Sequence, residues 1–139
     1  MNKLLIFILI IGLSYAEKEC QKGWFKVKEY CYHVGSKHLN NFDSEKYCKN
    51  LTSSLAEFEK EQIPDQLKAE LLKERLKNCG IEPCAWWLAD KKYKHKCVVL
   101  SHYIEDGIFK FTKYDSHIEK EEQICKYSKL KPICHKKLS

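Results

Sequence analysis

Beyond its first sixteen residues, this sequence of 139 residues lacks any apolar stretch long enough to span a bilayer. It also lacks internal repeats, low-complexity segments and a linker, and neither His-Glu-x-x-His nor Gly-x-Ser-x-Gly occurs in it. The first absence predicts a soluble product, the second predicts one domain, and the third argues against the common hydrolase mechanisms.

Histidine is present, but its distribution does not favour catalysis. The six histidines are scattered along the chain: His33, His38, His95, His102, His117 and His135. Lone histidines among lysines are more often surface residues than general bases. We therefore expect no enzymatic activity and no cofactor.

The first sixteen residues have the pattern of a secretory signal peptide. Lys3 supplies a positive charge, residues 4–13 form an almost unbroken apolar run, and Ala16 ends a short segment of the kind that signal peptidase cleaves. Cleavage after Ala16 leaves residues 17–139 as a mature, secreted, extracellular chain. Its length of about 120 residues is enough for one domain with one modest core.

Cysteine is abundant in the mature chain. Its eight cysteines are Cys20, Cys31, Cys48, Cys79, Cys84, Cys97, Cys125 and Cys134. An even number of cysteines in a secreted chain indicates a complete disulfide framework. Zinc is the competing interpretation, but Cys79-x4-Cys84 has no second half-site of matching spacing.

Two helices are predicted in the first half of the mature chain. One begins with Asn41 as its N-cap, and the other spans about residues 62–76. The inner face of the first helix is expected to carry Phe42, Tyr47, Cys48 and Leu51. The inner face of the second is expected to carry Ile63, Leu67, Leu71, Leu72 and Leu76.

Short strands are predicted around the helices. Residues 20–32 have the composition of a hairpin, and residues 85–89, 97–100 and 108–111 are apolar runs between charged loops. Helices followed mainly by short strands indicate an α+β fold with a disulfide-rich second half.

Five motifs together resemble the C-type-lectin-like domain family. In the order of the family they are Cys20-x2-Gly23-Trp24-x6-Cys31-Tyr32, Phe42-x5-Cys48, Leu51-x3-Leu55-Ala56-Glu57-Phe58, Trp86-Trp87-Leu88-Ala89-Asp90 and Lys131-Pro132-Ile133-Cys134. In the fourth motif alanine replaces the family's glycine. The resemblance implies a single C-type-lectin-like domain with two helices and short antiparallel strands over residues 17–139.

The second half aligns with the family in two ways. In the first alignment, residues 97–100 are the core cysteine strand, Cys125 is the partner of its cysteine, and the loop after Asp90 is short. In the second, residues 106–114 resemble the long loop of the family, and residues 121–125 lead into the core strand. The sequence leaves both alignments open.

The expected disulfides are the same in either alignment. The bridges that the resemblance implies directly are Cys20–Cys31 and Cys48–Cys134. The remaining cysteines then form Cys97–Cys125 and Cys79–Cys84. With every thiol paired internally, we expect a monomer or a non-covalent oligomer.

Sugar binding in this family depends on a calcium ion held by a Glu-Pro-Asn or Gln-Pro-Asp tripeptide and by a later Trp-Asn-Asp. Here the only Glu-Pro is Glu82-Pro83, which precedes the tryptophan strand, and Trp-Asn-Asp does not occur. In the second alignment the tripeptide position holds residues 118–120, which are Ile-Glu-Lys. The sequence therefore predicts neither a metal site nor calcium-dependent sugar recognition.

Basic side chains crowd the loop after the tryptophan strand, where the family's ligand loops emerge. This basic segment comprises Lys91, Lys92, Tyr93, Lys94, His95 and Lys96. Together with a formal net charge of +6, it favours a sulfated glycan, a phospholipid headgroup or an acidic protein as partner; nucleic acid is not expected in an exported protein. The lysines expected to extend the patch are Lys110, Lys113, Lys129, Lys131, Lys136 and Lys137. The alternative is an ordinary solvated loop, because short lysine runs are common on soluble surfaces.

One modification site is predicted from the sequence. Asn50-Leu51-Thr52 is an acceptor for N-glycosylation in a secreted chain. It lies near the end of the first predicted helix, where we expect an exposed side chain.

The resemblance implies a non-catalytic binding protein. As a small secreted chain without appended domains, it resembles the members of this family in venoms and in the saliva of blood-feeding animals. Those members bind clotting factors, platelet receptors or anionic membranes. The expected function is calcium-independent binding of a protein or anionic surface, with an anticoagulant effect that impairs haemostasis. The alternatives are a carbohydrate-binding innate-immune lectin and a small secreted hydrolase or inhibitor on another disulfide scaffold.

Overall fold

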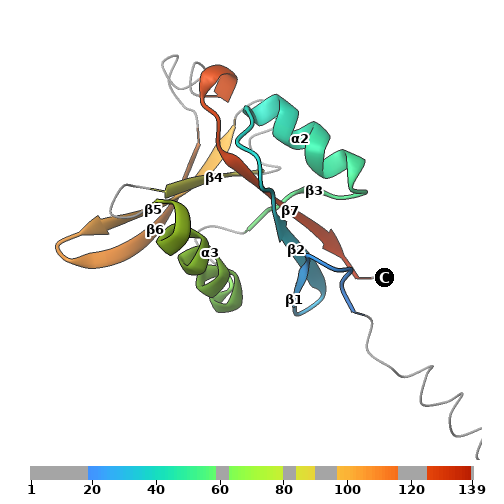
Figure 1. Cartoon of the computed structure of the whole chain (residues 1–139), viewed down its shortest axis with the longest axis horizontal. Coiled ribbons are helices and arrows are strands. Elements are labelled where there is room, and N and C mark those ends of the chain that lie inside the picture. The colour runs from blue at the N-terminus through green and yellow to red at the C-terminus, as the bar shows by residue number, and fades with distance from the viewer. Residues whose placement is uncertain (1–18, 59–62, 80–83, 90–96, 116–124, 139) are drawn as a thin grey trace, which may run out of the picture.

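The computed structural model describes five stretches of the chain (Figure 1): residues 19–58, 63–79, 84–89, 97–115 and 125–138. The elements in these stretches are β1 (Phe25–Val27), β2 (Tyr30–Val34), α2 (Asn41–Asn50), β3 (Ser54–Leu55), α3 (Asp65–Asn78), β4 (Cys84–Leu88), β5 (Val98–Glu105), β6 (Ile108–Asp115) and β7 (Lys131–Lys137). The predicted α+β class is confirmed. No helix in these five stretches is long and apolar enough to cross a membrane.

The last strand of the chain lies in the middle of the sheet. The strand order is β1-β2-β7-β4-β5-β6, with β3 also paired to β7. The pairs are antiparallel except β4 with β7, which run parallel with Trp86 opposite Lys131. β7 also pairs with β2 from Tyr30 to Val34, so the C-terminal end of the domain lies beside its first hairpin (Figure 1).

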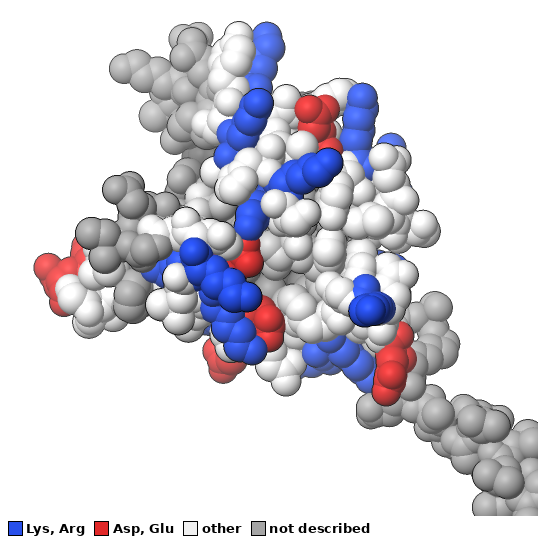
Figure 2. Space-filling model, in the orientation of Figure 1, with Lys and Arg blue, Asp and Glu red and all other residues white. Residues whose placement is uncertain are grey.

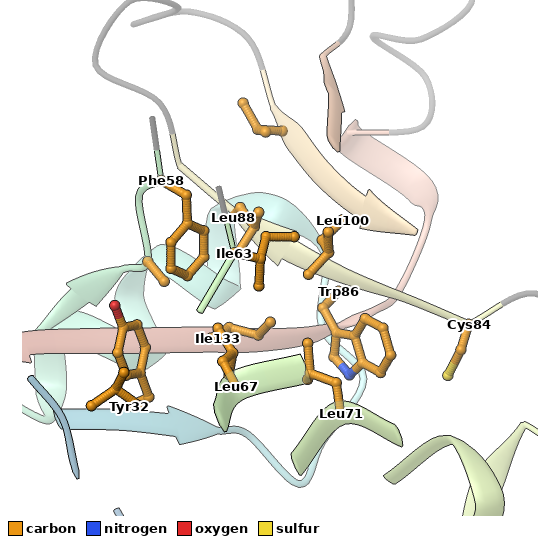
Figure 3. Close-up of a cluster of buried hydrophobic side chains, with 13 residues drawn as sticks. Tyr32, Phe58, Ile63, Leu67, Leu71, Cys84, Trp86, Leu88, Leu100 and Ile133 are labelled. Atoms are coloured by element: carbon orange, nitrogen blue, oxygen red, sulfur yellow. The ribbon is translucent and has the colours of Figure 1, made fainter. Parts of the chain in front are cut away.

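The central strands are buried on both faces. Along β4, Trp86 and Leu88 belong to one hydrophobic cluster, and Trp87, between them, belongs to a second cluster. Successive side chains of a strand point to opposite faces, so the two clusters lie on opposite sides of the sheet. Leu67 and Leu71 of α3 point into the first cluster (Figure 3), while α2 contributes to the second.

Helix α2 begins one residue earlier than the sequence predicted. Its N-cap is Asn40, whose side-chain oxygen accepts a 2.8 Å hydrogen bond from the backbone N–H of Asp43. The expectation for Phe42 is also wrong, because its side chain is 63% exposed. Ser44 and Cys48 form the buried stripe instead, and a residue six positions before Cys48 lies about 120° away around a helix.

Helix α3 is close to its predicted position, but its buried face differs from the prediction. Leu67, Leu71 and Arg75 are buried at intervals of four residues. Leu72 is 36% exposed and Leu76 is 79% exposed. The apolar spacing therefore predicted the wrong inner face at Leu72 and Leu76. The buried position four residues after Leu71 is occupied by Arg75, which an apolar pattern does not mark.

The buried arginine is held by a histidine that the sequence analysis placed on the surface. Arg75 and His102 are each 1% exposed. Nη1 of Arg75 donates to the carbonyl oxygen of His102 at 2.8 Å and lies 3.2 Å from Nδ1 of the same residue. The imidazole also stacks on the ring of Phe111, with 4.2 Å between ring centroids. A surface position for His102 is thus wrong, and the contact joins α3 to β5 and β6.

A tight turn decides between the two alignments. Glu105 pairs with Ile108, so Asp106 and Gly107 alone connect β5 to β6. Both have positive φ, 53° and 76°, as a two-residue type I′ hairpin turn requires. Because β5 also pairs with β4, residues 97–100 lie at the start of β5 and correspond to the core cysteine strand, as in the first alignment. The second alignment, with a long loop over residues 106–114, is wrong.

The different burial of the α3 leucines predicts different effects of truncation. Leu71→Ala removes a fully buried side chain and should lower the free energy of unfolding by about 2–5 kcal/mol. Leu76→Ala, in the same helix, should change it by less than about 0.5 kcal/mol. Equilibrium urea unfolding of the oxidised protein measures both, and equal losses would contradict the assigned face of α3.

Candidate binding surface

The basic segment is carried by two neighbouring strands. Leu88 at the end of β4 pairs with Val98 at the start of β5, so residues 89–97 form one connection between adjacent antiparallel strands. The segment Lys91–Lys96 itself lies outside the described residues. The described residues that flank the segment are Ala89 and Cys97. We call these two residues and the strand ends next to them the base of the segment.

The β4 side of this base is fixed by backbone and side-chain hydrogen bonds. The N–H of Ala89 donates to the carbonyl oxygen of Ala56 at 2.9 Å, and Ala89 forms a parallel bridge with Glu57. The indole N–H of Trp87 donates to the carbonyl oxygen of Leu39 at 2.6 Å. Since Trp87 is fully buried, this bond satisfies the only polar group of its side chain. It also connects the end of β4 to the segment before α2.

The β5 side is fixed by a disulfide and by strand pairing. Cys97 is 5% exposed and bonded to Cys125, 28 residues further along the chain. The next residue, Val98, is buried and pairs with Asp115 of β6 as well as with Leu88. Both ends of the connection therefore rest on buried structure, and a ligand-binding segment on a rigid base loses less entropy when it binds.

All eight cysteines form disulfides, and none is free. The structure brings together the pairs that the sequence analysis expected: Cys20–Cys31, Cys48–Cys134, Cys79–Cys84 and Cys97–Cys125. Cys48 and Cys134 are both completely buried, so their bridge fastens α2 to β7 within the second cluster. Cys79–Cys84 connects the end of α3 to β4.

The other lysines expected to extend the basic patch do not form one surface. Nζ of Lys131 contacts a carboxylate oxygen of Glu74, and Nζ of Lys137 lies 3.8 Å from one of Glu29. Lys131 and Lys137 are the two ends of β7, about 20 Å apart. Figure 2 shows basic and acidic side chains interspersed on one face. The expectation of a continuous patch through β7 is therefore wrong.

Three of the four remaining lysines of that set also have local contacts. On β6, Nζ of Lys110 lies 3.3 Å from a carboxylate oxygen of Glu105, and Nζ of Lys113 donates to the carbonyl oxygen of Phe58 at 2.8 Å. Nζ of Lys136 lies 4.3 Å from the ring centroid of Trp24. Lys129 is exposed before β7. The contacts of Lys110, Lys113 and Lys136 are local, and a count of lysines in the sequence does not reveal them.

The glycosylation acceptor lies on the surface of the helix. Asn50 is the last residue of α2 and is exposed. After it, the backbone N–H of Leu51 donates to the carbonyl oxygen of Cys48, and that of Thr52 donates to the carbonyl oxygen of Lys49. An exposed side chain at a helix end is accessible to a modifying enzyme, and a glycan at Asn50 stays a prediction.

Metal-binding groups were sought among the histidine, cysteine, aspartate and glutamate side chains. Within the described stretches no three of them gather where they could hold a metal ion. Glu82-Pro83 and residues 118–120, the positions compared above with the calcium tripeptide, lie outside those stretches.

Known structures share this architecture. The C-type-lectin-like domain of mouse CD72a superimposes with a TM-score of 0.62 at 22% identity, over 87% of this chain and 96% of that one. Rhodocetin gives a TM-score of 0.53 at 17% identity, over 88% of this chain and 100% of that one. The chain therefore has the C-type-lectin-like fold.

One curated protein is similar to the chain in sequence. Over 103 residues the chain is 29% identical to Snaclec B9 of Macrovipera lebetinus. The matched region covers 67% of this chain and 69% of the relative. No family model matches the sequence.

The disulfides Cys97–Cys125 and Cys79–Cys84 should differ in their contribution to stability. A disulfide restricts the unfolded chain more when it closes a longer loop, about 3–4 kcal/mol for Cys97–Cys125 and about 2 kcal/mol for Cys79–Cys84 in the chain-entropy treatment. We expect the double variant C97A/C125A to unfold at a lower denaturant concentration than C79A/C84A. Guanidinium unfolding of the two variants measures this, and the reverse order would contradict it.

Proposed function

We propose that this domain is a secreted, non-catalytic protein that binds an extracellular protein or anionic surface without calcium and thereby impairs haemostasis. The fold supports binding rather than catalysis, and its sequence likeness to Snaclec B9 supports a place among small secreted members of the class. Secretion is supported by the expected signal peptide and by four disulfides, since disulfides persist in oxidising compartments.

The observation that carries the proposal is the connection between β4 and β5. Its paired ends leave only residues 89–97 for the loop that carries calcium ligands in sugar-binding members. Those residues contain no proline and one carboxylate, Asp90, beside five basic side chains. Calcium takes six to eight oxygen ligands, and this composition favours an anionic ligand over a cation.

Basic residues on a short, firmly anchored loop suit recognition of clustered negative charge. Their repulsion for one another is relieved when sulfate, phosphate or carboxylate groups approach, and the attraction weakens as salt screens it. The lysines on β6 and β7 are held by local partners, so the proposed contact is confined to residues 91–96.

Removal of the lysines in the basic segment should weaken retention on heparin, which serves as a probe of clustered sulfate. The quadruple variant with Lys91, Lys92, Lys94 and Lys96 changed to alanine should elute at clearly lower salt than the wild type. A control variant with alanine at the exposed lysines Lys22, Lys37, Lys46 and Lys49 loses the same formal charge elsewhere. Its elution should shift much less.

Two outcomes would count against this binding mode. Equal shifts for the two quadruple variants would show that net charge, not the segment, controls retention. Retention on immobilised mannose or galactose that chelation abolishes would favour a calcium-dependent lectin instead. Heparin retention itself should persist in EDTA, because the proposed contact needs no cation.

The haemostatic effect has its own test. Purified wild-type protein at micromolar concentration should prolong plasma clotting time, and the segment variant should prolong it less than the lysine control variant. No prolongation by the wild type would leave the binding surface in place but remove the haemostatic role.

A further inference from the structure

The contact between Arg75 and His102 has a chemical requirement. A guanidinium carries only N–H donors and stays protonated, so Nδ1 of His102 must be the acceptor in the 3.2 Å contact. The imidazole is therefore neutral, with its proton on Nε2. The same guanidinium nitrogen donates to the backbone oxygen of His102, so Arg75 contacts both the ring and the main chain of His102.

A protonated imidazole does not fit this arrangement. It would direct an Nδ1–H toward the guanidinium N–H, placing two donors and two positive charges together at a position that is 1% exposed. Burial, and then the Arg75 charge, lower the pKa of His102 below its ordinary value of 6.5. Both causes act in the direction that the hydrogen bond requires.

Among the described residues, the side chains opposite His102 on the neighbouring strands offer no carboxylate to an imidazolium. On β6, Phe111 lies opposite His102, and the next residue on that face is Lys113, another cation. On β4, the residue opposite His102 is Cys84, which is in a disulfide. Glu74, which precedes Arg75 in the chain, contacts Lys131, and Glu105, three residues after His102, contacts Lys110.

We propose that Arg75 and His102 form a pH-sensitive latch, which holds the C-terminal half of α3 against β5 while the imidazole is neutral and releases it when the imidazole is protonated. Release loosens the packing of this part of α3 on β5, while the Cys79–Cys84 bridge keeps the end of the helix attached to β4. The latch is independent of the proposed ligand and of its binding segment.

The sign of the pH effect follows from proton linkage. Because the folded-state pKa of His102 lies below that of the unfolded chain, the unfolded state binds more protons between the two values. The contribution of the latch is complete above about pH 6.5 and is lost as the pH falls through the folded-state value. Acid therefore weakens the latch.

Hydrogen exchange of the intact oxidised protein tests the latch. After correction for intrinsic rates, amides of residues 71–78 and 98–102 should exchange several-fold faster at about pH 5 than at about pH 7.5. His102→Gln should remove this difference, because an amide oxygen can accept from Arg75 and does not titrate. His33→Gln is the matched control and should keep the wild-type response. Its imidazole nitrogens lie 3.0 Å from the carbonyl oxygen of Gly23 and 2.8 Å from the hydroxyl of Tyr47, and both groups can accept from a protonated ring.

Three results would overturn the latch. The first is equal corrected exchange at both pH values in the wild type, and the second is the same pH response in His102→Gln. The third concerns the tautomer of His102 in the wild type, so it does not depend on the folding of a variant. Nitrogen chemical shifts of His102 at neutral pH should show the Nε2–H tautomer, and an imidazolium or an Nδ1–H tautomer would exclude the proposed geometry.

Discussion

The position of β7 in the sheet is the constraint on which the rest of the structure depends. This strand separates the β1–β2 hairpin from β4, β5 and β6, and it also pairs with β3. Its Cys134 is bonded to Cys48 of α2 across 86 residues, and both are completely buried. A bridge that closes so long a loop restricts the unfolded chain by about 4–5 kcal/mol in the chain-entropy treatment. It ties the last strand, one helix and one side of the core together.

Much of this arrangement could be predicted because buried strands leave a strong pattern in the sequence. Trp86, Trp87 and Leu88 form an unbroken apolar run, as expected of a strand that is buried on both faces. The Asp106-Gly107 dipeptide is also a strong hairpin signal, and a hairpin at this point agrees with the first alignment. Helix faces were harder, because Leu72 and Leu76 continue the apolar spacing of α3 although they are exposed.

The candidate site was predictable in position more than in extent. The basic segment follows the tryptophan strand in the sequence, and the pairing of Leu88 with Val98 makes it a strand-to-strand connection. The prediction that lysines of β6 and β7 extend the segment was wrong, because the partner of a lysine side chain depends on tertiary structure. Glu74 lies on α3, yet it meets Lys131 of β7. The Arg75–His102 contact was missed for the same reason, since 27 residues separate two polar groups that only the packed helix brings together.

Stability and the proposed recognition therefore involve different parts of the domain. Disulfides and strands that are buried on both faces fix the frame, and strand pairing together with the Cys97–Cys125 bridge fixes the two ends of the connection between β4 and β5. The proposed contact with an anionic ligand uses residues within that connection, which the pairing of its ends does not involve. The Arg75–His102 contact lies on β5, toward the end away from that loop. A change in protonation there acts first on the packing of α3, because the β4–β5 pairing and the Cys97–Cys125 bridge hold the base of the loop independently.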